Sequence, residues 1–90
     1  MSSYAHINGL TAGTALSTHS VQLKRVVINT KGAAANLLTL YDSASTTANV
    51  IAVIDTTTAI GDIMYDINTL NGLYAVLAAG TAADLTIVWE

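Results

Sequence analysis

The 90-residue sequence contains no cysteine, no proline and no phenylalanine, and only 10% of its residues are charged. The absence of cysteine excludes a disulfide framework, a cysteine-ligated zinc site and a thiol nucleophile. The length corresponds to one small domain, and a domain of this size buries only about 60% of the surface that its unfolded chain exposes. Because no disulfide can add stability, we expect it to come from packing and from assembly with other subunits.

Positive charge is especially scarce, and it is confined to Lys24, Arg25 and Lys31 in a chain whose net charge is −3. Nucleic-acid binding needs several basic side chains on one surface, so we expect no nucleic-acid partner. The charged fraction of 10% is well below the roughly 25% of an average soluble domain. This shortage of charge predicts that a neighbouring protein covers part of the surface.

Long hydrophobic runs are also missing, although 52% of the residues are hydrophobic and the mean hydropathy is +0.53. The longest uninterrupted apolar run, residues 73–79, is far shorter than the roughly 20 residues of a membrane-spanning helix. Residues 1–6 contain no lysine or arginine and precede no apolar stretch of signal-peptide length. We therefore expect no membrane partner and no export signal.

Alternation of apolar and polar residues, rather than helical spacing, organises the chain. In residues 84–90, Leu85, Ile87 and Trp89 fall on one face of a strand. Residues 73–79 are apolar on both faces, which predicts a central strand. Further strands are expected at residues 21–30, 37–41, 50–54 and 63–67.

Turn residues indicate how these strands are connected. Asn71–Gly72 favours a type I′ turn and predicts a hairpin between residues 63–67 and the strand that follows. Residues 80–83 form a second connection of hairpin length. The apolar positions of residues 21–30 change parity near Lys24–Arg25, which predicts a β-bulge there.

The pattern as a whole predicts an all-β fold. Strands separated by short loops, with no helix long enough for a crossover, favour antiparallel pairing. We expect a compact antiparallel β-sandwich, of jelly-roll or immunoglobulin-like type, with about six to eight strands. Residues 21–90 form this domain, and residues 1–20 form an N-terminal arm or an edge strand.

No constellation of catalytic or metal-binding residues stands out. Five aspartates occur at strand ends, where Asx turns explain them without a bound cation, and no EF-hand spacing occurs. His6 and His19, with the serines and aspartates of the chain, supply the residue types of a Ser-His-Asp triad. The chain has no Gly-x-Ser-x-Gly turn to position the serine nucleophile, so we do not expect a triad. We expect no enzyme activity, no catalytic residue, no cofactor and no metal.

Four of the five aromatic residues divide into two groups by their neighbours. Tyr65 and Trp89 lie in phase with aliphatic residues and are expected in the core. Tyr4 and Tyr41 are better suited to contacts with a partner. A sugar-binding face would instead need two or three of the rings to be coplanar and exposed. The pair Lys24–Arg25 either guards a sheet edge or forms ion pairs with acidic neighbours.

Four segments carry a resemblance to a known group of proteins. They are KRVVINTKG (residues 24–32), LTLYDSA (38–44), VIAVIDT (50–56) and GLYAVLAAGTAADLT (72–86). The strand and turn residues of these segments resemble those of small β-sandwich structural proteins of tailed bacteriophages. The resemblance implies a virion structural protein, most plausibly a capsid decoration (cement) protein at the capsid surface, made in the host cytoplasm.

The partners implied by this resemblance are further copies of the chain, as a homotrimer, and the major capsid protein. A tail, neck or fibre module and a carbohydrate-binding β-sandwich are the alternatives. Residues 1–20 are polar and small but carry an apolar residue every three to six positions, which suggests an arm that docks on a neighbour. The candidate contact residues are Tyr4, Ile7, Leu10, Leu16, Tyr41 and Tyr74.

Overall fold

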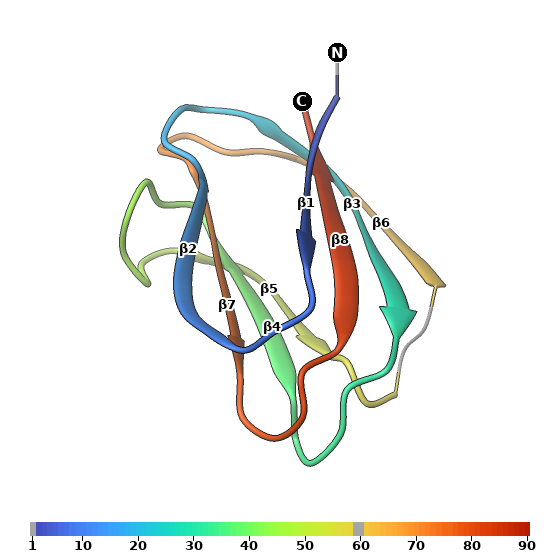
Figure 1. The fold of residues 1–90 in the computed structure, drawn as a ribbon. Coiled ribbons are helices and arrows are strands. Elements are labelled where there is room, and N and C mark those ends of the chain that lie inside the picture. Colours follow the sequence, from blue (N-terminus) through green and yellow to red (C-terminus); the bar gives the residue numbers. More distant parts are fainter. Residues whose placement is uncertain (1, 59–60) are drawn as a thin grey trace.

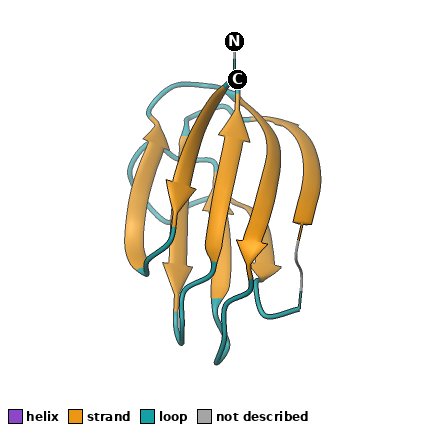
Figure 2. Cartoon of the chain, turned by 45° about the vertical axis from the view of Figure 1, so that its right-hand side comes forward, coloured by secondary structure: helices purple, strands orange, loops and turns teal. Residues whose placement is uncertain are grey.

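The computed structural model describes residues 2–58 and 61–90, and its described elements are all β-strands (Figures 1 and 2). The strands are β1 (Ser3–Ile7), β2 (Thr11–Ser17), β3 (Gln22–Thr30), β4 (Leu37–Tyr41), β5 (Val50–Asp55), β6 (Gly61–Asn68), β7 (Leu73–Ala78) and β8 (Asp84–Trp89). They form two four-stranded sheets. Sheet A has the order β1-β8-β3-β6, and sheet B has the order β2-β7-β4-β5.

All strand pairs are antiparallel, so the expected antiparallel β-sandwich is confirmed. The eight strands and their order in two sheets are those of a jelly roll, the first of the two expected types. Strands β1 and β2 form the edges on one side of the sandwich, and β5 and β6 form the edges on the other side. No described helix is long and apolar enough to span a bilayer.

Two connections differ from the sequence prediction. Strands β6 and β7 lie in different sheets, as do β7 and β8, so neither Asn71–Gly72 nor residues 80–83 close a hairpin. The hairpin predictions are therefore wrong. Asn71 does not adopt the positive φ that a type I′ turn requires. Gly72 is needed for a different reason, because a Cβ there would lie 2.5 Å from the carbonyl oxygen of Ser17.

The hydrophobic core lies between the central strands of the two sheets. Its least exposed side chains come mainly from β3, β4, β7 and β8 and include Leu23, Ile28, Leu38, Leu77 and Ile87. The alternation predicted for residues 84–90 and the central position predicted for residues 73–79 are both confirmed. Tyr65 and Trp89 are only partly buried and pack against the edge of this core. Burial raises the pKa of the Tyr65 hydroxyl.

The predicted bulge in the longest strand is confirmed. Strand β3 changes register between Leu23 and Arg25 against both of its neighbours, β6 and β8. Because a bulge sets two residues opposite one, the residues before and after it can both bury their apolar side chains. Leu23 and Val26 are consequently both fully buried, and Lys24 and Arg25 reach acidic residues on the neighbouring strands.

The N-terminal segment is part of the sandwich. Strand β1 pairs with β8 from Ser3 to Ile7, and β2 pairs with β7 from Thr11 to Ser17. Each strand is an edge of its sheet. The described chain begins and ends at the same end of the molecule, where Ser3 of β1 pairs with Trp89 of β8 (Figure 1).

Candidate interaction surfaces

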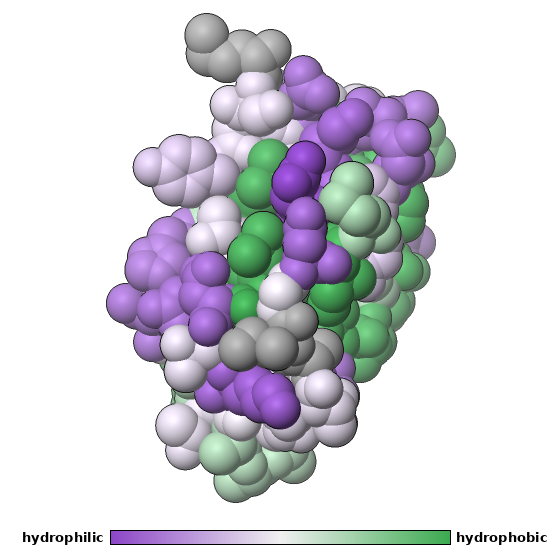
Figure 3. Space-filling model, turned by 90° about the vertical axis from the view of Figure 1, so that its right-hand side faces the viewer, coloured by the Kyte–Doolittle hydropathy of each residue, from purple (hydrophilic) through white to green (hydrophobic). Residues whose placement is uncertain are grey.

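The two outer faces of the sandwich differ in charge. Six of the nine charged residues of the chain belong to the outer surface of sheet A or the end of β8: Lys24, Arg25, Asp62, Asp66, Asp84 and Glu90. We call this surface the charged face. Figure 3 shows a hydrophobic band through the middle and along one flank of the molecule, while hydrophilic residues dominate the other flank.

Ion pairs join both cations of the charged face to three of its four carboxylates. Arg25 Nη1 lies 3.2 Å from an Asp62 carboxylate oxygen, and Lys24 Nζ lies 3.7 Å from both Asp66 and Glu90. Strand β3 is flanked by β8 and β6, so the interpretation of Lys24–Arg25 as an edge guard is wrong and the ion-pair alternative is correct. These pairs are solvent-exposed, and each contributes about 0–1 kcal/mol to stability.

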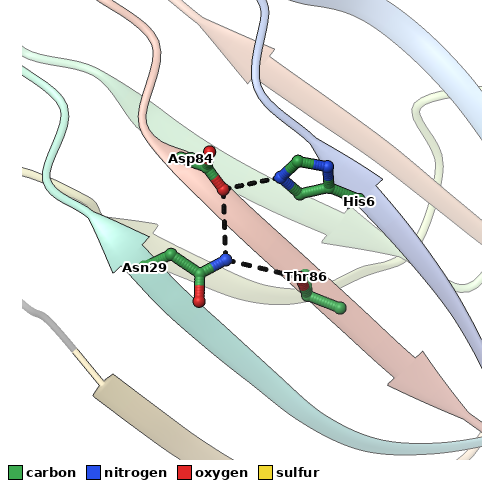
Figure 4. Close-up of polar contacts among 4 residues, drawn as sticks. All are labelled: His6, Asn29, Asp84 and Thr86. Carbon is green, nitrogen blue, oxygen red and sulfur yellow. Dashed lines mark hydrogen bonds and ion pairs between the residues drawn. The ribbon is translucent and has the colours of Figure 1, made fainter.

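A polar network at the far end of the charged face joins three strands (Figure 4). His6 Nε2 on β1 lies 2.7 Å from Asp84 Oδ1 on β8, and Asn29 Nδ2 on β3 donates to the same oxygen at 3.1 Å. These contacts lower the pKa of Asp84, with the hydrogen bond from His6 as the largest cause. Asn29 also reaches Thr86 Oγ1 at 3.4 Å. The network holds the edge strand β1 against the sheet.

The network does not assemble the triad considered from the sequence. Its one hydroxyl, on Thr86, contacts Asn29 and not His6. His19, the second histidine, lies in the β2–β3 connection, where its backbone exchanges hydrogen bonds with Ser17. Within residues 2–58 and 61–90 there is no cluster of three or more metal-ligating side chains and no pocket.

The outer surface of sheet B carries almost no charge. Its outward-facing residues are paired across β5, β4 and β7, as the register of these strands shows, and they are Leu37, Thr39, Tyr41, Val50, Val53, Tyr74, Val76 and Ala78. We call this surface the apolar face. Val50 and Val53 are 59% and 58% exposed, and Leu37 is 41% exposed. The one charged residue that these three strands add to the face is Asp55, at the end of β5.

Two tyrosines occupy one end of the apolar face. Tyr41 and Tyr74 lie opposite each other on β4 and β7, with ring centroids 6.3 Å apart and ring planes inclined by 59°. The Tyr74 ring lies over Gly13 of β2, so that a Cβ at this glycine would overlap the tyrosine hydroxyl. The tilt gives a packed aromatic pair rather than the flat platform on which a sugar ring stacks.

A carboxylate fixes the connection between β6 and β7. Asp42 accepts hydrogen bonds from the backbone N–H groups of Leu70 and Asn71, at 3.0 and 2.7 Å. Burial raises the pKa of Asp42, but the N–H groups of Asn71, Leu70 and Gly72 together outweigh this effect and lower it. The Leu70 side chain, 81% exposed, is thus presented on a fixed backbone.

The candidate contact residues do not gather on one surface. Tyr4 is 73% exposed on β1, and Leu10 is 54% exposed in the β1–β2 connection. Ile7 and Leu16 are partly buried and pack against the core. Tyr41 and Tyr74 are the members of the set that the structure brings together.

Sequence reasoning missed the most exposed apolar side chains on strands β5 and β6. Val50, Val53 and Met64 are each more than half exposed. The alternation of Met64 with Asp62 and Asp66 was a usable signal for its outward position. For Val50 and Val53 no local signal existed, because a run of β-branched residues looks the same in a central strand and in an edge strand.

Comparison of the chain with protein-family models, with curated proteins and with solved structures finds no match.

Proposed function

We propose that this protein is a non-enzymatic structural protein of a tailed-phage virion, a capsid decoration (cement) protein that self-associates and stabilises the head. The observation that carries the proposal is the contrast between the charged face and the apolar face. An uncharged sheet surface with Val50, Val53 and Leu37 exposed is suited to contact with protein rather than water. The resemblance of the strand and turn residues to phage proteins, and the jelly-roll fold that capsid proteins also use, support the assignment.

The energetics favour assembly through many small contacts. Fully burying a valine or leucine side chain contributes about 1.5–3 kcal/mol, and the partly exposed side chains here have less than that to gain. A single contact of this kind is weak. Repetition around a symmetry axis raises the effective concentration of each contact, so a homotrimer bound to the major capsid protein can be stable without a dominant anchor residue.

The proposal is tested by adding the purified protein to heads of the phage that encodes it. We expect co-sedimentation with the heads, and light scattering that gives the mass of a trimer. Val76→Lys, in the apolar face, should reduce binding at least tenfold, whereas Met64→Lys, on the charged face, should bind like the wild type. A stable monomer that does not bind heads would overturn the proposal, and labelled protein located on the tail would indicate a tail, neck or fibre subunit.

A further inference from the structure

Strand β5 is the least protected of the four sheet edges. Strand β1 has only five residues, β2 has two register shifts, and β6 carries Asp62 and Asp66. Short strands, bulges and charges are the features that keep edges from pairing with other chains. Strand β5 has the sequence VIAVID, with no charge before its last residue and one register shift near its beginning. Its regular part, Ala52–Asp55, therefore remains open to another strand.

The backbone of β5 shows which groups are available for pairing. The Thr56 N–H donates to Asn36 O, on the side of the strand that faces β4. Successive residues of a strand direct their backbone groups to opposite sides. The N–H and C=O groups of Val53 and the N–H of Asp55 therefore point to the open edge, and no described strand pairs with them. The Asp55 carbonyl already accepts hydrogen bonds from the N–H and hydroxyl of Thr58.

We propose that β5 pairs antiparallel with β5 of a second copy of this chain, across a two-fold axis that passes beside Val53. An axis perpendicular to the sheet keeps the outer face of both copies on the same side, so residues that oppose each other must share a face. Val53 opposite Val53 of the second copy meets this condition. The two residues then exchange both of their backbone hydrogen bonds, because their N–H and C=O groups already point to the edge.

The side chains fit the same register. Val53, 58% exposed on the apolar face, packs against its own symmetry mate, and Ala52 lies opposite Ile54 on the inner side. The two Asp55 residues lie four residues apart along the paired strands, so their carboxylates are separated by roughly 13 Å. This exceeds the Debye length of about 8 Å at physiological ionic strength. The only charge in the strand therefore does not oppose pairing.

The neighbouring edge supplies apolar surface that a second copy would cover. Ile51 of β5 and Ile63, Tyr65 and Ile67 of β6 pack against the core but are only partly buried. Hydrophobic residues are visible in the middle of the side of the molecule drawn in Figure 3. Pairing through β5 extends sheet B beyond this side and shelters these residues.

A two-fold contact links subunits but cannot close a trimer. Neighbouring threefold positions of an icosahedral shell are related by two-fold axes, so β5 pairing would join one trimer to the next. This role rests on the proposed function, whereas the pairing itself follows from β5 alone. In solution the contact doubles the mass of whatever unit the protein forms.

An introduced thiol tests the register, because the chain has no cysteine of its own. Opposed residues that exchange both hydrogen bonds have Cα atoms about 5.5 Å apart, a separation that a disulfide can bridge. Under mild oxidation, Val53→Cys should form disulfide-linked dimers at least tenfold faster than Met64→Cys, which is similarly exposed at 64%. Equal rates for the two variants would overturn the proposal.

Removing the donor tests the edge itself. Val53→Pro deletes an N–H that faces the open edge and leaves the hydrogen bonds to β4 in place. In sedimentation equilibrium the wild type should reach twice the mass of this variant at high concentration, with at least a tenfold difference in dissociation constant. Val53→Lys changes only an exposed side chain and should weaken self-association to the same extent. It replaces Val53→Pro as the test if the proline variant does not fold. Unchanged self-association in both variants would contradict the inference.

Amide hydrogen exchange separates this inference from the proposed function. On self-association, exchange of the Val53 and Asp55 amides should slow at least tenfold, while that of Ile54, which faces β4, should not change. If the Val53 amide were protected only when phage heads are added, the edge of β5 would bind the major capsid protein, and pairing with a second copy would be overturned. Heads that bind both the wild type and Val53→Pro equally would support decoration while removing any role of β5 in it.

Discussion

Asn36 and Thr56, both fully buried, form a hydrogen-bonded pair that joins three connections of the sandwich. Thr56 Oγ1 donates to Asn36 Oδ1 at 2.6 Å, and the same oxygen accepts the Ala83 N–H at 3.1 Å. The Asn36 amide nitrogen in turn donates to Ala79 O at 2.9 Å. No buried side-chain nitrogen or oxygen of the described residues lacks a partner. One side chain thus completes the polar contacts of an end of the sandwich where strands change sheets.

Truncation of this side chain is expected to be costly. Asn36→Ala leaves the Ala83 N–H and the Ala79 carbonyl without their partner, while the Thr56 hydroxyl keeps its contact with the backbone carbonyl of residue 36 at 3.1 Å. Each buried group left unpaired costs about 1–3 kcal/mol. We expect the free energy of unfolding, measured in urea, to fall by about 3 kcal/mol. Asn68→Ala, at an exposed position, should stay within about 0.5 kcal/mol of the wild type. Equal losses in the two variants would contradict this role of Asn36.

The Asp42 carboxylate should make stability depend on acid. Its pKa in the folded protein lies below the ordinary value of 3.8 because backbone N–H groups of the β6–β7 connection, led by Asn71, outweigh the effect of burial. The resulting stability is fully present above that ordinary value and is lost as the pH falls through the lowered pKa. Asp42→Asn should therefore be less stable at pH 7 and should lose less stability between pH 5 and pH 2.

The measurement is the thermal midpoint across this pH range. Asp55 and Asp84 also have lowered pKa values, so the stability of both proteins still falls in acid. The effect of Asp42 is therefore the difference between the falls in thermal midpoint of the wild type and of Asp42→Asn. If the midpoints of the wild type and Asp42→Asn fell in parallel, the hydrogen bonds to Leu70 and Asn71 would not be stabilising the fold.

Local signals in the sequence were sufficient to predict strands but not their partners. The strand at residues 37–41 and the bulge at Lys24–Arg25 were predictable because side-chain parity is read within a few residues. Residues 1–20 were expected to form an arm or an edge strand, and they form two edge strands, β1 and β2. Ser3–Ile7 was not located as a separate strand, because it mixes polar and apolar residues at an edge where burial is incomplete. Its partner, β8, lies at the other end of the chain.

Prediction of the candidate interaction surfaces also required knowledge of which strands pair with each other. Asn71–Gly72 predicted a hairpin because its two residues favour a type I′ turn, yet Asp42, 29 residues away, fixes Asn71 in another conformation. Val50 and Val53 belong to the apolar face through the register of β5 with β4, and β5 lies at the edge of its sheet. The scarcity of charge predicted a covered surface, and strand order shows which outer face carries almost no charge.

The contact between Gly13 and Tyr74 predicts that Gly13→Ala destabilises the wild-type protein but not the Tyr74→Ala variant. Gly13→Ala places a Cβ in the volume of the Tyr74 ring, and overpacking of this kind costs about 1–3 kcal/mol. In a Tyr74→Ala background the volume is empty, and Gly13→Ala should then be neutral or stabilise the fold by up to about 1 kcal/mol. Urea denaturation of the four proteins in this double-mutant cycle measures the coupling. Identical effects of Gly13→Ala in the two backgrounds would show that the ring does not lie over Gly13.

The network around Asp84 predicts a titration that NMR can follow at a single carboxyl carbon. Hydrogen bonds from His6 and Asn29 hold the pKa of Asp84 below its ordinary value of 3.8, and His6 is the larger cause. Both partners favour the ionised form, so removing either of them raises the pKa. We expect the midpoint of Asp84 to move upward in His6→Ala and, by less, in Asn29→Ala. The pKa of Asp55, which is lowered by hydrogen bonds from Thr57 and not by His6 or Asn29, should be the same in all three proteins. An Asp84 midpoint that did not move in His6→Ala would show that the 2.7 Å contact in Figure 4 does not form in solution, and the attachment of β1 would then rest on its backbone pairing with β8 alone.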